Sequence, residues 1–286
     1  GNAAPVAPSA VQANTKTVLI KDGAPTFTPT SMPRALDAEE IPGIVQDYRH
    51  AARNAIASGF DGVEIHAANG YLLDQFLKTE SNRRTDAYGG SIQNRARLLI
   101  EVATAVTQAI GGGRTGIRLS PVTPANDVVD ADPQPLFDHV IRALGPLGLA
   151  YVHVIEGQTG GARDHQQGDV PFDYAALRTA YRSAGGQGAW MVNNGYSSEL
   201  AQQALTDGAD LVAFVVVSQL MWIGGTRPCA TAAPAPDVEV YLTPAALAGL
   251  TRGEGRYASQ RTSASSEGER RDPLHEVEDR SGWMPL

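Results

Sequence analysis

Residues 36–66, LDAEEIPGIVQDYRHAARNAIASGFDGVEIH, contain the repeating unit that decides the fold. Apolar residues in the first part recur with the period of a helix that Gly59 ends: Ile41, Ile44, Val45, Tyr48, Ala52 and Ile56. The short apolar run DGVEIH, residues 61–66, then predicts a buried strand. A helix that leads directly into a buried strand is the building unit of α/β proteins.

The same unit recurs along the chain. We predict helices over residues 91–113, 133–148, 172–186 and 197–208, followed in turn by strands over 114–121, 149–157, 188–196 and 209–217. Strict alternation of helix and strand predicts parallel strands joined by right-handed crossovers. Two architectures remain, a doubly wound sheet and a (β/α)8 barrel.

Polar residues at the strand ends favour the barrel. They follow three of the predicted strands: His66 and Asn69, Arg118 and Ser120, Asn193 and Asn194. Several strand ends that carry chemistry are typical of a barrel, whereas a doubly wound sheet concentrates its ligand at one crevice. The predicted fold class is therefore α/β, of the (β/α)8 TIM-barrel type. Because such a barrel needs eight strands, we expect an incomplete barrel here, with three strands before Gly1.

The chain divides by composition into three regions. Residues 1–36 are rich in proline and predict an extended loop with a hairpin around Asp22 and Gly23. Residues 37–217 form the predicted barrel segment with the candidate active-site motifs. Residues 218–286 have an atypical, polar composition and predict a largely disordered tail.

Charge and cysteine content exclude several classes of function. A net charge of −8 offers no basic face, so we expect a small-molecule partner and no nucleic acid. The single cysteine, Cys229, excludes an internal disulfide and any zinc or iron–sulfur site held by several cysteines, and we predict no metal. The sequence lacks an apolar run of about 18 residues and a signal peptide, so we expect no membrane association and a cytoplasmic location.

His66, Asn69 and Tyr71 are the candidate catalytic residues. His66 and Asn69 can both donate hydrogen bonds to one acceptor oxygen, which would polarise an electron-poor alkene. A phenol such as that of Tyr71 can deliver a proton to a developing carbanion. The alternatives are a histidine satisfied within a turn, an asparagine that takes a left-handed conformation before Gly70, and a core aromatic.

Arg118, Asn194 and Gly195 are the candidate cofactor-binding residues. An arginine at a strand end suits an anion or an electron-rich ring, although a salt bridge to an acidic loop residue explains it equally well. The turn at Asn194 and Gly195 precedes a predicted helix and suits a phosphate. Many such turns use Asn-Gly only for its positive φ.

Several long motifs resemble one family, in that family's order. They are PVAPSA (5–10), TPTSMPRALDAEEI (28–41), EIHAANGYLLDQFL (64–77), SNRRTDAYGGSIQNRARLLIEV (81–102), GIRLSP (116–121) and ADLVAF (209–214). This combination is similar to the Old Yellow Enzyme family of FMN-dependent ene-reductases, over Gly1 to Phe214. The resemblance implies a (β/α)8 barrel that binds FMN, takes electrons from NADPH or NADH, and reduces the C=C bond of α,β-unsaturated carbonyl or nitro compounds.

The resemblance also implies roles for individual residues. His66 and Asn69 would hold the activating oxygen of the substrate, Tyr71 would protonate its α-carbon, and His66 would lie close to the flavin. Arg118 would meet the pyrimidine edge of the flavin. Asn194 and Gly195 would meet its phosphate.

Two departures from the family's pattern leave a second function open. The family's N-terminal third has no counterpart in this sequence. After Phe214, the chain reads Val215-Val216-Val217-Ser218, where the family has a Gly-Arg-Pro-Phe-like turn that binds phosphate. The alternative is a non-catalytic remnant of the family without stable FMN binding. The dienoyl-CoA reductases, a related class, are excluded because they need a cysteine cluster.

Overall fold

A computed structural model of the protein describes residues 4–21, 23–166, 170–216 and 238–242. The chain divides into two compact units, Gly1–Phe214 and Val215–Leu286. In the second unit the described residues include strand β10 (Val238–Leu242). The rest of the tail predicted over 218–286 lies outside the described residues.

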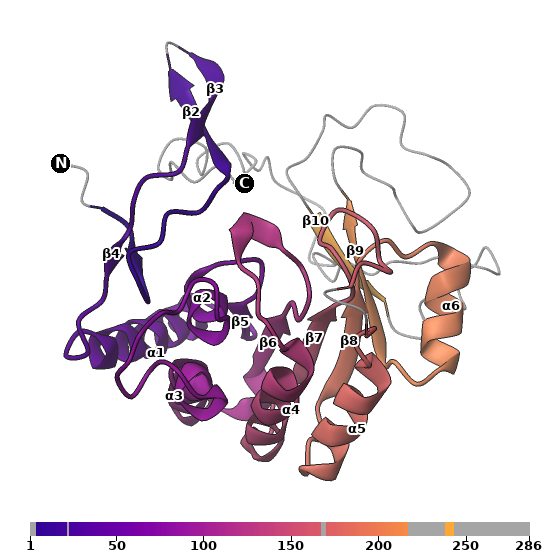
Figure 1. The fold of residues 1–286 in the computed structure, drawn as a ribbon. Coiled ribbons are helices and arrows are strands. Elements are labelled where there is room, and N and C mark those ends of the chain that lie inside the picture. The colour runs from indigo at the N-terminus through magenta and orange to yellow at the C-terminus, as the bar shows by residue number, and fades with distance from the viewer. Residues whose placement is uncertain (1–3, 22, 167–169, 217–237, 243–286) are drawn as a thin grey trace, which may run out of the picture. The chain divides into compact units, whose positions relative to one another are not determined.

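The first unit is built on five strands that run parallel to one another in sequence order (Figure 1). These are β5 (Val63–Ala67), β6 (Thr115–Leu119), β7 (Tyr151–Ile155), β8 (Ala189–Asn193) and β9 (Leu211–Val216). All five strands predicted from the sequence are confirmed. Because every strand ends at the same edge of the sheet, the loops that follow the strands share one side of the unit.

Helices lead into each of the five strands. They are α1 (Ile41–Ala57), α3 (Ile92–Ile110), α4 (Pro133–Leu144), α5 (Tyr174–Ser183) and α6 (Ser198–Thr206). Short 3-10 turns accompany them: η1 (Gly112–Arg114), η2 (Ala125–Asp127) and η3 (Gly145–Leu147). Ser91, Asp173 and Ser197 cap α3, α5 and α6, because each side chain accepts a backbone N–H of the first turn. The helix α2 (Leu72–Leu77), which follows β5, was not among the predicted helix–strand units.

The core lies between the helices and one face of the sheet. Buried strand residues on this face are Ile65, Ala67, Ile117, Leu119, Val152, Val154 and Val192. Facing helix residues that are equally buried include Leu98, Leu99, Val102, Phe137, Val140 and Ile141. Alternation of side chains along each strand therefore sends the intervening residues to the opposite, inner face.

The N-terminal segment forms the predicted hairpin. Strand β2 (Lys16–Lys21) pairs antiparallel with β3 (Ala24–Pro29), and Lys21 lies opposite Ala24 across a two-residue turn. Gly23 has a φ of 76°, a conformation that glycine adopts without strain. Figure 1 shows this hairpin projecting beyond the helices and strands of the unit. Two shorter strands, β1 (Val6–Ala7) and β4 (Arg34–Ala35), pair in parallel.

Among the described residues, no helix combines the length and the apolar character that crossing a bilayer requires.

Candidate active site

The inner face of the sheet carries polar side chains in a regular arrangement. The register places His66 of β5 opposite Arg118 of β6, and Arg118 opposite His153 of β7. Glu64 lies opposite Gly116, two residues earlier in the same strands. Because the other face of these strands is packed against the helices, His66 and Arg118 share one polar surface.

The end of β5 brings the three predicted catalytic residues together. The rings of His66 and Tyr71 meet edge to face, with centroids 4.8 Å apart and planes at 64°. Asn69 lies in the turn between them and has a φ of 57°. Tyr71 is 40% exposed, so the alternative reading of it as a core aromatic is wrong. The left-handed conformation expected of Asn69 before Gly70 is present, in addition to any role of its side chain.

A backbone hydrogen bond to Nδ1 of His66 favours the tautomer with its hydrogen on Nε2. Its Nδ1 accepts a hydrogen bond from the backbone N–H of Ala68, at 3.3 Å. A ring nitrogen that accepts a hydrogen bond carries no proton, so the neutral imidazole bears its hydrogen on Nε2. His66 therefore offers a donor, as the binding of a substrate oxygen requires.

Asn69 is fixed by three hydrogen bonds from segments far away in the sequence. Its N–H donates to the Ser120 hydroxyl at 2.8 Å, and its carbonyl accepts from the Asn126 amide at 2.8 Å. Its side-chain Oδ1 accepts from the Thr159 hydroxyl at 2.7 Å. Since Oδ1 is engaged, the donor nitrogen Nδ2 remains, and it has no hydrogen-bond partner among the described residues.

A buried ion pair anchors the turn from below. Lys78 Nζ donates to Asp74 Oδ2 at 3.1 Å and to the carbonyl of Ser120 at 2.9 Å, and both side chains are fully buried. The N–H of Gly70 donates to the same Asp74 oxygen at 2.9 Å. Burial raises the pKa of Asp74, while Lys78 and these hydrogen bonds oppose the rise. The pair thereby ties α2 and the β5 turn to the end of β6.

Gly116 allows three strands to interact across the inner face. A Cβ at this position would overlap the ring of Tyr151, which lies over β6. The Tyr151 hydroxyl bonds Glu64 of β5, and His153 Nδ1 lies 2.9 Å from Glu64 Oε2. Burial alone raises the pKa of Glu64, but hydrogen bonds from His153 and Tyr151 and the charge of Arg118 hold it below its usual value. Glu64 is therefore a carboxylate that compensates part of the positive charge on this face.

Arg118 connects this face to the end of β8. Its guanidinium donates to Asn193 Oδ1 at 3.2 Å, and Asn193 Nδ2 donates to the Ala213 carbonyl of β9 at 2.9 Å. The half-buried guanidinium therefore lies beside His66 in register and is linked to the strand end that carries Asn194 and Gly195. Arg118 thus shares the inner face with His66 and is hydrogen-bonded to Asn193, the residue that precedes Asn194 and Gly195.

At the end of β8, the side chains are engaged and the backbone is left open. Asn194 Nδ2 donates to the carbonyls of Glu156 and Gln158, at 2.6 and 2.8 Å. Asn194 and Gly195 have φ values of 103° and 64°. The N–H groups of Gly195 and Tyr196 have no hydrogen-bond partner in the described part of the chain. Asn194 can thus serve an anion through the backbone of its turn, since its side-chain amide is occupied.

A carboxylate, a phenol and a guanidinium meet beside this turn. The Tyr196 hydroxyl donates to Glu156, and Arg163 Nη1 lies 3.4 Å from the same Glu156 oxygen. The Arg163 guanidinium also lies over the Tyr196 ring, 4.8 Å from its centroid. Burial raises the pKa of Glu156 by more than Tyr196 and Arg163 lower it.

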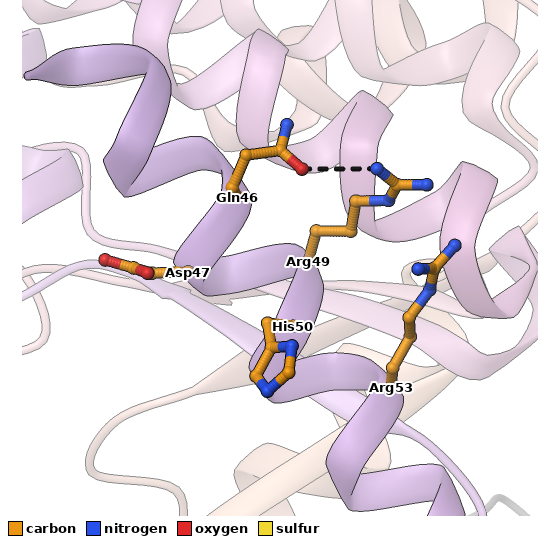
Figure 2. A pocket seen from close by; sticks show the side chains of 5 residues that line it. All are labelled: Gln46, Asp47, Arg49, His50 and Arg53. Carbon is orange, nitrogen blue, oxygen red and sulfur yellow. Dashed lines mark hydrogen bonds between the residues drawn. The ribbon is translucent and has the colours of Figure 1, made fainter.

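A shallow hollow elsewhere on the surface is unrelated to these residues. It has a volume of about 240 Å³ and is lined by Gln46, Asp47, Arg49, His50 and Arg53, all on α1 (Figure 2). Arg49 Nη1 donates to Gln46 Oε1 at 3.2 Å, and none of the predicted site residues lines the hollow. Within the described residues, no group of three or more His, Cys, Asp or Glu side chains could hold a metal ion.

Sequence reasoning missed the residues that support the site. Glu64 and His153 could have been found from the alternation of side chains along a strand. Glu64 lies two residues before His66, and His153 lies opposite Arg118, so both face the same side of the sheet as the predicted residues. Thr159 and Arg163 carry no such signal, since they lie in the long loop between β7 and α5.

Comparisons with known proteins identify the family of this chain. The sequence profile of the "NADH:flavin oxidoreductase / NADH oxidase family" matches residues 2–215. The chain is 43% identical over 206 residues to the 12-oxophytodienoate reductase 7 of Oryza sativa subsp. japonica. The aligned region covers 69% of this chain and 51% of the relative.

Solved structures are similar over the same part of the chain. A structure of morphinone reductase in complex with tetrahydroNAD is 41% identical, with a TM-score of 0.64, and the match covers 73% of this chain and 55% of that one. The Old Yellow Enzyme homologue from Zymomonas mobilis is 37% identical, with a TM-score of 0.64, over 73% and 56% of the two chains. The chain thus spans about half the length of the relatives it matches.

These neighbours are (β/α)8 barrels, and the parallel strands and helices of this chain correspond to part of such a barrel. The predicted fold class is confirmed. A profile that matches three quarters of the sequence, together with relatives above 35% identity, leaves one conclusion. The chain belongs to the NADH:flavin oxidoreductase / NADH oxidase family, to which the Old Yellow Enzymes belong.

Proposed function

We propose that this chain carries the alkene-reducing site of an FMN-dependent oxidoreductase. The reaction is reduction of the activated C=C bond of α,β-unsaturated carbonyl or nitro compounds with NAD(P)H. The observation that carries the proposal is the cluster at the end of β5, where two donors, His66 and Asn69, lie beside the exposed ring of Tyr71. Family membership supports a flavin as the redox group.

The inner face has the donor set that FMN requires. The guanidinium of Arg118 suits the pyrimidine edge of the ring, where a reduced flavin concentrates negative charge. The open N–H of Gly195, in the turn that Asn194 shapes, suits the phosphate at the end of a late barrel strand. When bound there, FMN would supply the hydride that the β-carbon of the substrate accepts.

The residues of the chain supply binding and the proton. In the proposal, His66 Nε2 and Asn69 Nδ2 donate to the carbonyl or nitro oxygen of the substrate, which draws electron density from the alkene. The Tyr71 hydroxyl then gives its proton to the α-carbon, on which negative charge develops. Two donors and one acid on a single short turn suit this reaction, because the oxygen and the α-carbon of an enone are separated by only two bonds.

The reductant in the proposal is NADPH or NADH. The related morphinone reductase has been solved in complex with tetrahydroNAD, which supports a nicotinamide cofactor as the reductant here. The proposed substrate is a small electron-poor alkene, and the proposed location is the cytoplasm, where reduced nicotinamide cofactors are available.

The test is to purify the full chain with added FMN and to follow flavin absorbance under anaerobic conditions. The expected result is a bound-flavin spectrum that bleaches on addition of NADPH or NADH and recovers on addition of 2-cyclohexenone. Protein that takes up no flavin, or flavin that bleaches and does not recover with any enone or nitroalkene, would contradict the proposal. The first of these outcomes favours the alternative of a non-catalytic family member.

A further inference from the structure

The end of β8 presents two open donors next to a cation. The N–H groups of Gly195 and Tyr196 have no hydrogen-bond partner among the described residues, and Asn194 and Gly195 both have positive φ. A Cβ built on Gly195 meets only Arg163 Cβ, at 3.9 Å, so the space above the turn is open. The Arg163 side chain therefore starts near this turn, just beyond the space that a Cβ at Gly195 would fill.

The guanidinium of Arg163 stays at this turn. It lies over the Tyr196 ring, 4.8 Å from the centroid, and the attraction between cation and ring favours this position. Its contact with Glu156 is 3.4 Å, longer than the 2.7–2.9 Å that is usual for a charge-assisted hydrogen bond. The Arg163 side chain is 37% exposed, so solvent reaches it, and its guanidinium has five N–H donors.

Glu156 has a second hydrogen-bond partner in the same cluster, Tyr196. The Tyr196 hydroxyl donates to the Glu156 oxygen that faces Arg163. The side chain of Glu156 is only 16% exposed, less than half the fraction for Arg163. The arginine is consequently more accessible than the carboxylate to an anion that approaches from solvent.

We propose that Arg163 binds the phosphate of FMN, together with the N–H groups of Gly195 and Tyr196. The inference rests on the proposed function and adds a residue to it. A phosphate monoester carries a charge of nearly −2 at neutral pH, and arginine binds such groups through two parallel hydrogen bonds. The sequence after β9, Val215-Val216-Val217-Ser218, offers no cation where the resemblance leads one to expect an arginine. Arg163, from the loop after β7, meets this need from the other side of β8.

The experiment compares FMN with riboflavin, which has the same ring and no phosphate. The dissociation constants of both are measured by flavin fluorescence for the wild-type chain and for Arg163→Gln. We expect the variant to bind FMN about 10-fold more weakly, the loss of one charge-assisted contact, with no change for riboflavin. Arg163→Lys keeps the charge without the planar fork, so its affinity for FMN should lie between those of wild type and Arg163→Gln.

Arg182→Gln is the matched control. Arg182 lies over a tyrosine ring, Tyr181, at 5.5 Å, bonds Asp210 at 2.7 Å and is 38% exposed, but it reaches the start of β8 rather than its end. Arg182→Gln should leave the ratio of the dissociation constants of FMN and riboflavin at the wild-type value. An equal ratio in wild type and Arg163→Gln would overturn the inference and leave the proposed function standing.

A chain that binds neither flavin would refute the proposed function, and inorganic phosphate then decides the inference. Amide chemical shifts of the ¹⁵N-labelled chain are followed during titration with phosphate. Shifts at Gly195 and Tyr196 that are reduced in Arg163→Gln but kept in Arg182→Gln support the role of Arg163. The absence of shifts, or shifts equal in all three proteins, overturns it.

Discussion

The two ends of the candidate site are built in opposite ways. At the end of β5, the backbone is bound internally: Asn69 N–H bonds Ser120, Gly70 N–H bonds Asp74, and the side chains of Asn69 and Tyr71 are presented. At the end of β8, the side chain of Asn194 is bound internally and the backbone of the turn is presented. Chemistry that needs an acid or a specific donor uses side chains, whereas an anion can be bound by backbone N–H groups.

The same contrast extends to the supporting charges. Beneath the β5 turn, Lys78 and Asp74 form an ion pair without solvent exposure. Beside the β8 turn, Arg163 and Glu156 form a longer and partly exposed contact. A buried pair fixes geometry because an unpaired charge there is very costly, while an exposed arginine can exchange one anion for another.

Removal of one hydroxyl at each end should give the sharpest difference. Tyr71→Phe should slow reoxidation of reduced FMN by 2-cyclohexenone by about 10²- to 10⁴-fold, because the proton donor is lost, and leave reduction by NADPH unchanged. Tyr196→Phe, the matched change at the β8 end, should alter neither rate by more than a few-fold. Stopped-flow absorbance measures both steps. Equal slowing in the two variants would break the comparison.

The buried pair of Lys78 and Asp74 should contribute more to the free energy of unfolding than the exposed contact of Arg163 and Glu156 does. Lys78→Met leaves the Asp74 carboxylate buried without its cation and should lower the free energy of unfolding by about 3–5 kcal/mol. Arg163→Gln should cost less than about 1 kcal/mol, because that contact is exposed. Urea unfolding followed by circular dichroism measures both values. The double variant Asp74→Leu/Lys78→Met should regain part of the loss, and a double variant as unstable as Lys78→Met alone would contradict the ion-pair explanation.

The Asn194 side chain should contribute stability rather than ligand contacts. Asn194→Gly tolerates the positive φ but leaves the carbonyls of Glu156 and Gln158 without their donor, and should cost about 1–3 kcal/mol. Asn194→Ala adds backbone strain and should cost about 1 kcal/mol more. Thermal and urea unfolding separate the two variants. If both variants were as stable as wild type, the side chain would have no structural role and direct contact with phosphate would have to be reconsidered.

Thr159 should act on the substrate through Asn69. Thr159→Val keeps the shape of the side chain but removes the hydrogen bond to Asn69 Oδ1, so the amide loses its orientation. We expect KM for 2-cyclohexenone to rise by about 2- to 10-fold, with flavin affinity unchanged. Thr179→Val, which removes a hydroxyl bonded within α5, is the control and should leave KM as in wild type. A similar change in both variants would point to a general effect on stability.

The smallest expected effect is the pH dependence that Glu156 introduces. Burial raises its pKa in the folded chain above the unfolded value of about 4.3. The unfolded state therefore releases this proton first, so the stability linked to protonated Glu156 is present below that value and is lost as pH rises through the folded pKa. Unfolding of Glu156→Gln and wild type between pH 4 and pH 8 should show wild type losing stability relative to the variant. Parallel curves would mean that the pKa of Glu156 is not raised.

Local patterns explain why so much of the fold was predictable. Helices and strands of the first unit follow from the spacing of apolar residues, and the hairpin around Gly23 follows from its turn sequence. The short helix α2 has only six residues, too few for a periodic pattern to define its bounds from the sequence. His66, Asn69 and Tyr71 were predictable together because six consecutive residues contain all three.

The sequence by itself determined the alternation of helix and strand, the family and the β5 cluster, because each depends on residues close together in the chain. Only the tertiary structure decided what supports them. Thr159 reaches Asn69 across 90 residues, and Tyr151 reaches Glu64 over Gly116. Parallel strands place residues from distant segments side by side, and the conformation of the loops then selects which side chains meet. The loop after β7, which has no regular pattern, brings Arg163 over the ring of Tyr196 in this way.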